Sequence, residues 1–217
     1  MKKDSAHDSL GTVVELIQEI DRDCRTKIGG SERGLVNIKL HFIERALKAT
    51  SKKLTEEQLI AWLLAKKLAA RDLIVHWELP YPTGERKKCD LVIQINNSCR
   101  IWLELKLAWK AWMGWEGVPV HRNSLYLSYL QGKNRSHSFR HDFEKIGHSD
   151  WPKGDFRAIC LVGFDHRARP MDAEVVSVVN DVQGTGIPWE IGAVRHWSDR
   201  RSGDFRINVW SWLLPPV

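Results

Sequence analysis

The stretch CDLVIQINNSCRIWLELKL, residues 89–107, decides the fold because it predicts two strands joined by a tight turn. Each half is short and apolar, and the Asn-Asn-Ser sequence between them is typical of a hairpin turn. If the strands pair around Asn97, Asp90 faces Glu104 across the hairpin. Side chains alternate between the two faces of a strand, so Glu104 and Lys106 project from the same face. The stretch therefore predicts two carboxylates and an ammonium group close together on one face of a sheet.

This arrangement favours a metal ion. Directly opposed side chains on paired strands have Cβ atoms about 4.5–5.5 Å apart, and two carboxylates at that distance repel each other unless a cation lies between them. Oxygen ligands with remaining waters suit Mg²⁺, so we expect Asp90 and Glu104 to bind the ion, with the backbone carbonyl of Leu105 as a third ligand. Lys106 would orient or deprotonate a water, or neutralise a developing oxyanion. The alternative is an amphipathic hairpin whose charged side chains face water.

The rest of the chain predicts an α/β protein with a mixed sheet. Apolar periodicity and capping residues predict helices over 10–28, 31–49, 55–70, 137–147 and 171–182. Short apolar runs predict strands over 73–79, 89–95, 101–107, 156–164, 189–197 and 205–213. Residues 108–135 are expected to be irregular. The first two helices are expected to form an N-terminal extension over 1–50, followed by one domain over 51–217.

Asp90 followed by Glu104-Leu105-Lys106, in this strand context, resembles the PD-(D/E)XK nuclease superfamily. The resemblance covers roughly residues 55–165 and implies a restriction-endonuclease-like fold, a mixed sheet core flanked by helices. It also implies a nuclease that uses Mg²⁺, with Mn²⁺ as a possible substitute, and hydrolyses phosphodiester bonds, most simply as an endonuclease on DNA. Asp90 and Glu104 would be ligands and Lys106 an active-site residue. Cys89 stands where the family pattern has proline.

Many proteins of this superfamily carry a further acidic residue on the helix before the strands. Glu56 and Glu57 are the candidates here, and Glu57 is preferred because it shares a helical stripe with apolar residues. Both could instead be first-turn partners of the helix dipole. Glu78, on the first strand, is a further candidate, or a charge at the rim of the sheet.

Composition and charge restrict the class of protein further. The 217 residues are 43% hydrophobic and 28% charged, which are ordinary values for a globular chain. No run approaches the roughly 20 apolar residues of a membrane span, and the N-terminus lacks the apolar block of a secretory signal, so we expect a cytoplasmic protein. Of the six excess positive charges, five lie within 51–150, which favours nucleic acid, DNA more than RNA, as the partner.

Other features carry less chemical information. His137 and His141 have a spacing that could hold a metal on a helix, although a solvated or DNA-facing helix edge is the simpler interpretation. The basic segment 132–141 could contact phosphates, and it could equally be a charged loop. Tryptophans at 109, 112 and 115 could stack on bases, although core packing is favoured over that role. The four cysteines lack zinc-binding spacing and are expected to be reduced thiols.

Two alternatives to the nuclease remain open from the sequence. The first is a non-catalytic module on the same fold that binds nucleic acid or protein, because a fold does not fix a function. The second is an assembly protein that uses the N-terminal helices and the tryptophans. These helices could also form a homodimer interface in a nuclease that cuts both strands of a duplex.

Overall fold

A computed structural model describes residues 2–27, 54–82, 87–113, 119–121, 138–147, 151–184, 186, 188–198 and 204–216. The described helices are α1 (Lys2–Lys27), α3 (Glu56–Ala69), α4 (Phe139–Gly147) and α5 (Asp172–Gln183). The described strands are β1 (Ile74–Pro80), β2 (Lys88–Asn96), β3 (Cys99–Trp109), β4 (Ala111–Met113), β5 (Pro119–His121), β6 (Phe156–His166), β7 (Glu190–Ser198) and β8 (Phe205–Leu214). None of these helices is both long enough and apolar enough to cross a membrane.

Six of the strands form one mixed sheet in the order β1-β2-β3-β6-β8-β7. All neighbours pair antiparallel except β3 and β6, which run parallel. A parallel pair needs a crossover connection, and α4 lies in that connection. The strands β3, β6 and β8 are buried along almost their whole length, so the centre of the sheet is covered on both faces.

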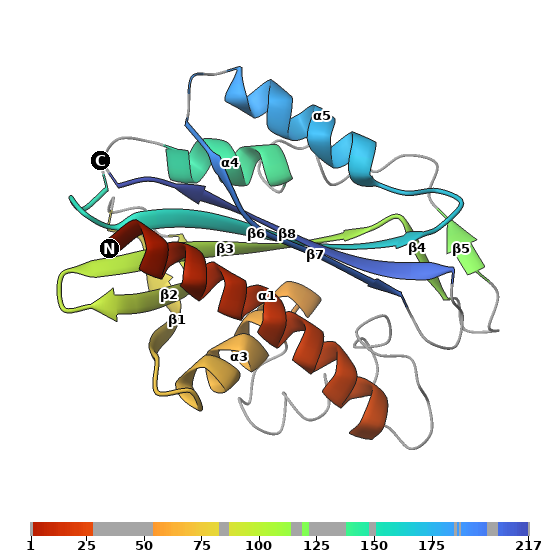
Figure 1. The fold of residues 1–217 in the computed structure, drawn as a ribbon, viewed down its shortest axis with the longest axis horizontal. Coiled ribbons are helices and arrows are strands. Elements are labelled where there is room, and N and C mark those ends of the chain that lie inside the picture. Colours follow the sequence, from red (N-terminus) through yellow and green to blue (C-terminus); the bar gives the residue numbers. More distant parts are fainter. Residues whose placement is uncertain are drawn as a thin grey trace.

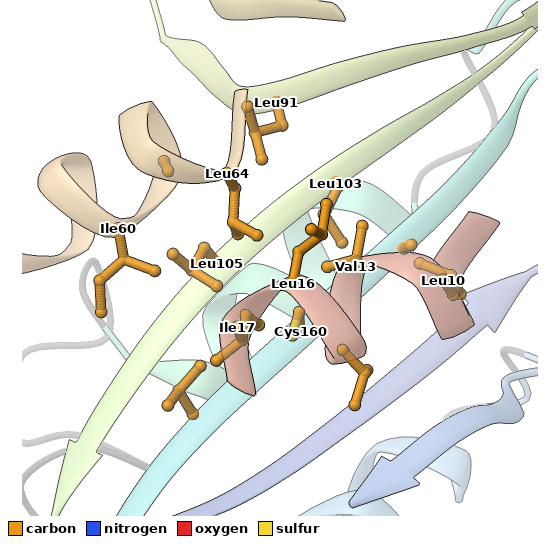
Figure 2. Packing of buried hydrophobic residues seen from close by; sticks show 14 of the residues in the cluster. Leu10, Val13, Leu16, Ile17, Ile60, Leu64, Leu91, Leu103, Leu105 and Cys160 are labelled. Atoms are coloured by element: carbon orange, nitrogen blue, oxygen red, sulfur yellow. The ribbon is translucent and has the colours of Figure 1, made fainter. Parts of the chain in front are cut away.

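Helices α1 and α3 cover one face of the sheet, and α4 and α5 cover the other (Figure 1). On the first face, the apolar stripe of α1 packs on alternate residues of β3, including Leu103 and Leu105 (Figure 2). Ile60 and Leu64 of α3 join the same core beside Leu91 of β2. This face is held by apolar contacts, and its residues are those that strand alternation places opposite Glu104 and Lys106.

The second face contains a separate core of aromatic side chains. Phe139 and Phe143 of α4 pack on each other and on Trp212 of β8, with ring centroids 4.8–5.6 Å apart. Trp102 of β3 contacts Trp151 edge to face. Glu104 and Lys106 follow Trp102 on this face of β3, so their side chains project toward the layer that contains α4.

The start of α3 is fixed by its cap. The Thr55 hydroxyl accepts a hydrogen bond from the backbone N–H of Gln58, and the Gln58 side chain accepts one from the Thr55 N–H, which is a capping box. Because Glu57 lies in the first turn, the capping box also determines where its carboxylate points.

Most of the predicted elements are confirmed within one or two residues. The prediction that 108–135 is irregular was wrong in part, because β3 continues to Trp109 and β4 and β5 form a small antiparallel sheet. The first helix begins at Lys2 rather than near residue 10, since helix geometry continues through its polar first turns. The predicted helix 31–49 lies outside the described residues.

The α1 helix belongs to the same core as the sheet. Leu10, Val13 and Ile17 are buried against it, and Arg195 of β7 donates a hydrogen bond of 2.7 Å to Gln18. The apolar stripe of α1 is therefore used inside the chain. The proposed boundary near residue 50 and a homodimer through the N-terminal helices stay predictions, since 28–53 lie outside the described residues.

Candidate active site

The β2–β3 hairpin has the register that the sequence predicted. Leu91 faces Leu103 and Ile93 faces Ile101, so the pairing is centred on Asn97. The regular pairing ends at Leu91 and Leu103, one residue before the position where Asp90 would face Glu104. The two acidic residues therefore lie where the hairpin opens.

Beyond the last regular pair, carboxylates accept the backbone hydrogen bonds of β3 that a paired β2 would otherwise accept. The N–H of Leu105 donates a 2.8 Å hydrogen bond to Asp90 Oδ2, and the N–H of Leu107 donates a 3.1 Å hydrogen bond to Glu57 Oε1. Because the N–H and C=O of one strand residue point to the same side, the Leu105 carbonyl faces the same edge as Asp90. The Cys89 thiol donates to the Leu103 carbonyl at 3.3 Å, where the regular pairing stops.

Glu78 marks a distortion in β1 next to this opening. Its φ is +53°, a backbone conformation that costs about 1–3 kcal/mol in a residue other than glycine. It lies between the regular pairs Trp77–Leu91 and Leu79–Cys89, so it is the β1 residue at the level of Asp90. The Glu78 carboxylate accepts a 2.8 Å hydrogen bond from Gln58. Glu78 is thus tied to the start of α3, whereas Glu57 reaches the edge of β3.

Helix α4 adds two residues to this site, Asp142, which the sequence suggested only as a neighbour of His141 in a metal-binding group, and Lys145, which sequence reasoning missed. Lys106 Nζ lies 3.4 Å from Asp142 Oδ2 and 3.7 Å from Glu57 Oε1. Lys145 Nζ lies 3.1 Å from Glu104 Oε2 and 3.4 Å from Asp142 Oδ1. Each oxygen of Asp142 therefore faces a different ammonium group.

A signal for Asp142 was present in the sequence. Phe139, Phe143 and Ile146 form the buried stripe of α4, and Asp142 lies within that stripe. A charged residue on the buried face of a short helix requires a partner of opposite charge. The sequence alone does not say which strand that helix covers, so the partners could not be named.

Burial dominates the electrostatics of the acidic side chains. It raises the pKa of Asp90 to about 7, although the hydrogen bond from Leu105 opposes the change. It also raises the pKa of Glu104 to about 7, against the attraction of Lys145. The pKa of Glu57 is raised as well, again because burial outweighs Lys106. The positive charge near these carboxylates is therefore too small to offset the effect of burial on their ionised forms.

The two lysines respond in the opposite sense. Burial favours the neutral amine, but the carboxylates of Asp142 and Glu57 outweigh burial and raise the pKa of Lys106. The carboxylates of Glu104 and Asp142 likewise raise the pKa of Lys145. Both lysines are therefore ammonium groups near neutral pH. Of the roles expected for Lys106, neutralising negative charge fits this state better than removing a proton from water.

The donor set fits a divalent cation. Four carboxylates against two ammonium groups leave two negative charges uncompensated when all are ionised, which is the charge that Mg²⁺ or Mn²⁺ neutralises. Glu104 Oε1 is buried and has no hydrogen-bond partner among the described residues, so one hard oxygen donor is left unused. Within the same part of the chain, no three His, Cys, Asp or Glu side chains are grouped closely enough to hold a metal ion by themselves. Ammonium groups lie between the carboxylates instead.

The other sequence candidates lie elsewhere. Trp109 stacks on Phe164 with ring centroids 3.8 Å apart, which is core packing. The backbone N–H of His141 donates to Ser138 Oγ, and the buried Nε2 of its ring has no partner among the described residues. The side chains of Trp112 and Trp115, and residues 132–137 including His137, lie outside the described residues. Cys89, Cys99 and Cys160 are buried and carry reduced thiols.

Comparison with known proteins adds no relative. No family model matches the chain, no curated protein matches it, and no solved structure matches it. The fold and the site are therefore the basis on which a class of protein can be proposed.

Proposed function

We propose that this protein is a divalent-metal-dependent nuclease that hydrolyses phosphodiester bonds, built on a restriction-endonuclease-like fold of the PD-(D/E)XK superfamily. The observation that carries the proposal is the gathering of Asp90, Glu104 and Lys106 where β2 leaves β3, with Glu57 beside Lys106 and with one oxygen of Glu104 buried without a partner among the described residues. The element order also supports it, because three antiparallel strands follow α3, and after α4 a fourth strand runs parallel to β3.

The residues of the chain divide the work. Asp90, the free oxygen of Glu104 and the Leu105 carbonyl would hold the cation. A bound Mg²⁺ or Mn²⁺ supplies Lewis acidity, which acidifies a water and offsets charge on the reacting phosphate. Lys106 presents an ammonium group beside these ligands, where it neutralises negative charge that develops on the phosphate. Glu57 orients Lys106 and fixes the edge of β3 through Leu107.

DNA is the substrate that we propose first. A polyanion is favoured by the net charge of +6 and by the concentration of positive charge within 51–150, the segment that carries the site. These charges do not distinguish DNA from RNA, so both belong in the assay.

The test is cleavage of supercoiled plasmid, single-stranded DNA and RNA in Mg²⁺, Mn²⁺ or EDTA. Wild type is compared with Glu104→Gln and with Glu144→Gln, a control on α4 whose carboxylate pairs with Arg140 at the surface. We expect metal-dependent cleavage that Glu104→Gln abolishes and Glu144→Gln retains. Equal cleavage by wild type and Glu104→Gln would contradict the proposal. Salt-sensitive binding without cleavage would favour the non-catalytic module.

A further inference from the structure

Lys145 forms an ion pair with Glu104, which is one of the proposed metal ligands. Its Nζ lies 3.1 Å from Glu104 Oε2, and both side chains are almost wholly buried, with 13% and 7% of their surfaces exposed. A buried carboxylate needs a cation or hydrogen-bond donors to remain ionised. Lys145 meets this need for one oxygen of Glu104, while Oε1 has no partner among the described residues.

Lys145 can leave Glu104 without losing its other partners. Asp142 Oδ1 lies 3.4 Å from its Nζ, and the centroid of the Tyr81 ring lies 5.1 Å away, within the range of a cation–π contact. An ammonium group that moved toward Asp142 and Tyr81 would remain paired and still buried. Asp142 and Tyr81 therefore offer the Lys145 ammonium group a second position, away from Glu104.

Lys106 is placed differently. Its ion-pair partners are Glu57 and Asp142, and it forms no ion pair with Glu104 among the described residues. Of the two lysines, Lys145 is the one whose ammonium group forms an ion pair with Glu104, a proposed metal ligand. Two cations that use the same buried carboxylate compete for it, because each repels the other at short range.

We propose that Lys145 is a built-in counter-ion for Glu104 that competes with the divalent cation, and that Asp142 and Tyr81 receive its ammonium group when the cation binds. This inference rests on the proposed function, since it assumes that Glu104 is a metal ligand. It assigns α4 a regulatory task. The helix sets how much metal is needed to load the site, and it keeps Glu104 neutralised until then.

The test is direct measurement of metal binding by calorimetry. The full-length wild type, Lys145→Gln and Lys153→Gln are titrated with Mg²⁺ and with Mn²⁺ at fixed pH and salt. Lys153 is an exposed lysine and serves as a control of equal charge change. We expect Lys145→Gln to bind metal about tenfold more tightly or better, and Lys153→Gln to bind as wild type does. The Mg²⁺ concentration that gives half-maximal cleavage should fall by a similar factor.

A second variant protects the test against misfolding. Lys145→Met keeps the apolar stem over Tyr81 and removes only the charge, so it should also bind metal more tightly. Circular dichroism establishes that each variant is folded.

Three outcomes decide the proposal. Tighter binding by the Lys145 variants supports it. Equal or weaker binding by folded Lys145 variants, while wild type still binds metal and cleaves, overturns this inference and leaves the nuclease standing. If wild type and all variants bind no metal and cleave nothing, the proposed function fails and this inference fails with it.

Discussion

The protein has two clusters around a buried carboxylate, one at Asp165 and one at Glu104, and they differ in how completely the carboxylate oxygens are paired. Asp165, at the end of β6, is fully buried, and each of its oxygens has a donor. Arg206 donates to both oxygens at 2.8 and 2.7 Å, and the N–H of Met171 donates to Oδ2 at 2.9 Å. At Glu104, by contrast, one oxygen faces Lys145 and the other has no partner among the described residues.

The difference separates a cluster whose polar groups are all paired from one that is left incomplete. The Asp165 cluster ties β6, β8 and the start of α5 together, and its hydrogen bonds raise the pKa of Arg206 above its ordinary value. A complete network of this kind stabilises one conformation and offers no site to a ligand. The Glu104 cluster is short of positive charge and of donors, which is the condition under which a buried group binds something else.

The largest expected effect comes from Glu104→Gln. Cleavage should fall by about 10⁴-fold, equivalent to about 5 kcal/mol in transition-state stabilisation, because a neutral amide is a poor ligand for a hard cation. Near pH 8 the free energy of unfolding of the metal-free protein should stay equal or rise, because burial, which raises the pKa of Glu104 to about 7, opposes its ionised form, and Lys145 keeps Asp142 as a partner. Urea unfolding and single-turnover cleavage measure the two quantities. A folded variant that retains more than a tenth of wild-type activity would place the reaction elsewhere.

The Asp165→Ala variant should show the reverse behaviour. Removing one partner of a buried ion pair should cost about 3–5 kcal/mol in urea unfolding, because Arg206 keeps its charge in a partly buried place. Asp172→Asn is the matched control, since Asp172 contacts the same guanidinium but is 45% exposed and should cost less than about 1 kcal/mol. If Asp165→Ala left stability intact and abolished cleavage, the assignment of the two clusters would be inverted.

The metal-free protein should lose stability as pH rises. Asp90 and Glu104 have folded-state pKa values raised to about 7, so between about pH 4 and pH 7 the folded protein binds more protons than the unfolded chain. Their contribution is complete below pH 4 and lost through pH 7. We expect up to about 5 kcal/mol less stability at pH 8 than at pH 5 in EDTA, because each of the two groups contributes over about two pH units. Saturating Mg²⁺ should remove most of this slope, whereas a slope unchanged by Mg²⁺ would argue against a metal at these carboxylates.

The smallest effect is expected at the start of α3. Thr55→Ala removes one half of the capping box and should cost about 1 kcal/mol, while Thr55→Ser should cost little. Because Glu57 lies in the same turn, Thr55→Ala should also reduce cleavage more than this loss of stability explains. Cleavage measured well below the unfolding temperature tests that point. Unchanged cleavage would show that the cap does not position Glu57.

The hairpin was predictable because its information is local. Residue alternation put Glu104 and Lys106 on one face, and the turn around Asn97 fixed the register that the structure has. The position where regular pairing stops was not predictable, because alternation carries no signal for it or for the positive φ of Glu78 at the same level of β1. The prediction of Glu57 over Glu56 came from its apolar stripe, and the structure places its carboxylate against Lys106 and Leu107.

The contribution of α4 could not be predicted from the same reasoning. Alternation and periodicity describe the faces of single elements, and they do not say which helix is laid over which strand. Asp142 and Lys145 reach Lys106 and Glu104 only because the chain crosses over the sheet between β3 and β6. The site is therefore shared between a local motif and a long-range contact, and only the local part could be found from the sequence.

The contact between α1 and β7 joins the beginning of the chain to a strand that is synthesised late. Asp21 accepts a hydrogen bond from Trp197 and Gln18 accepts one from Arg195, so α1 cannot complete its packing until β7 has emerged. The 171 residues from Lys27 to Ser198 take about 10–30 s to translate. During that time the apolar stripe of α1 is incompletely covered. A chain that ended before β7 would leave part of this stripe exposed to water.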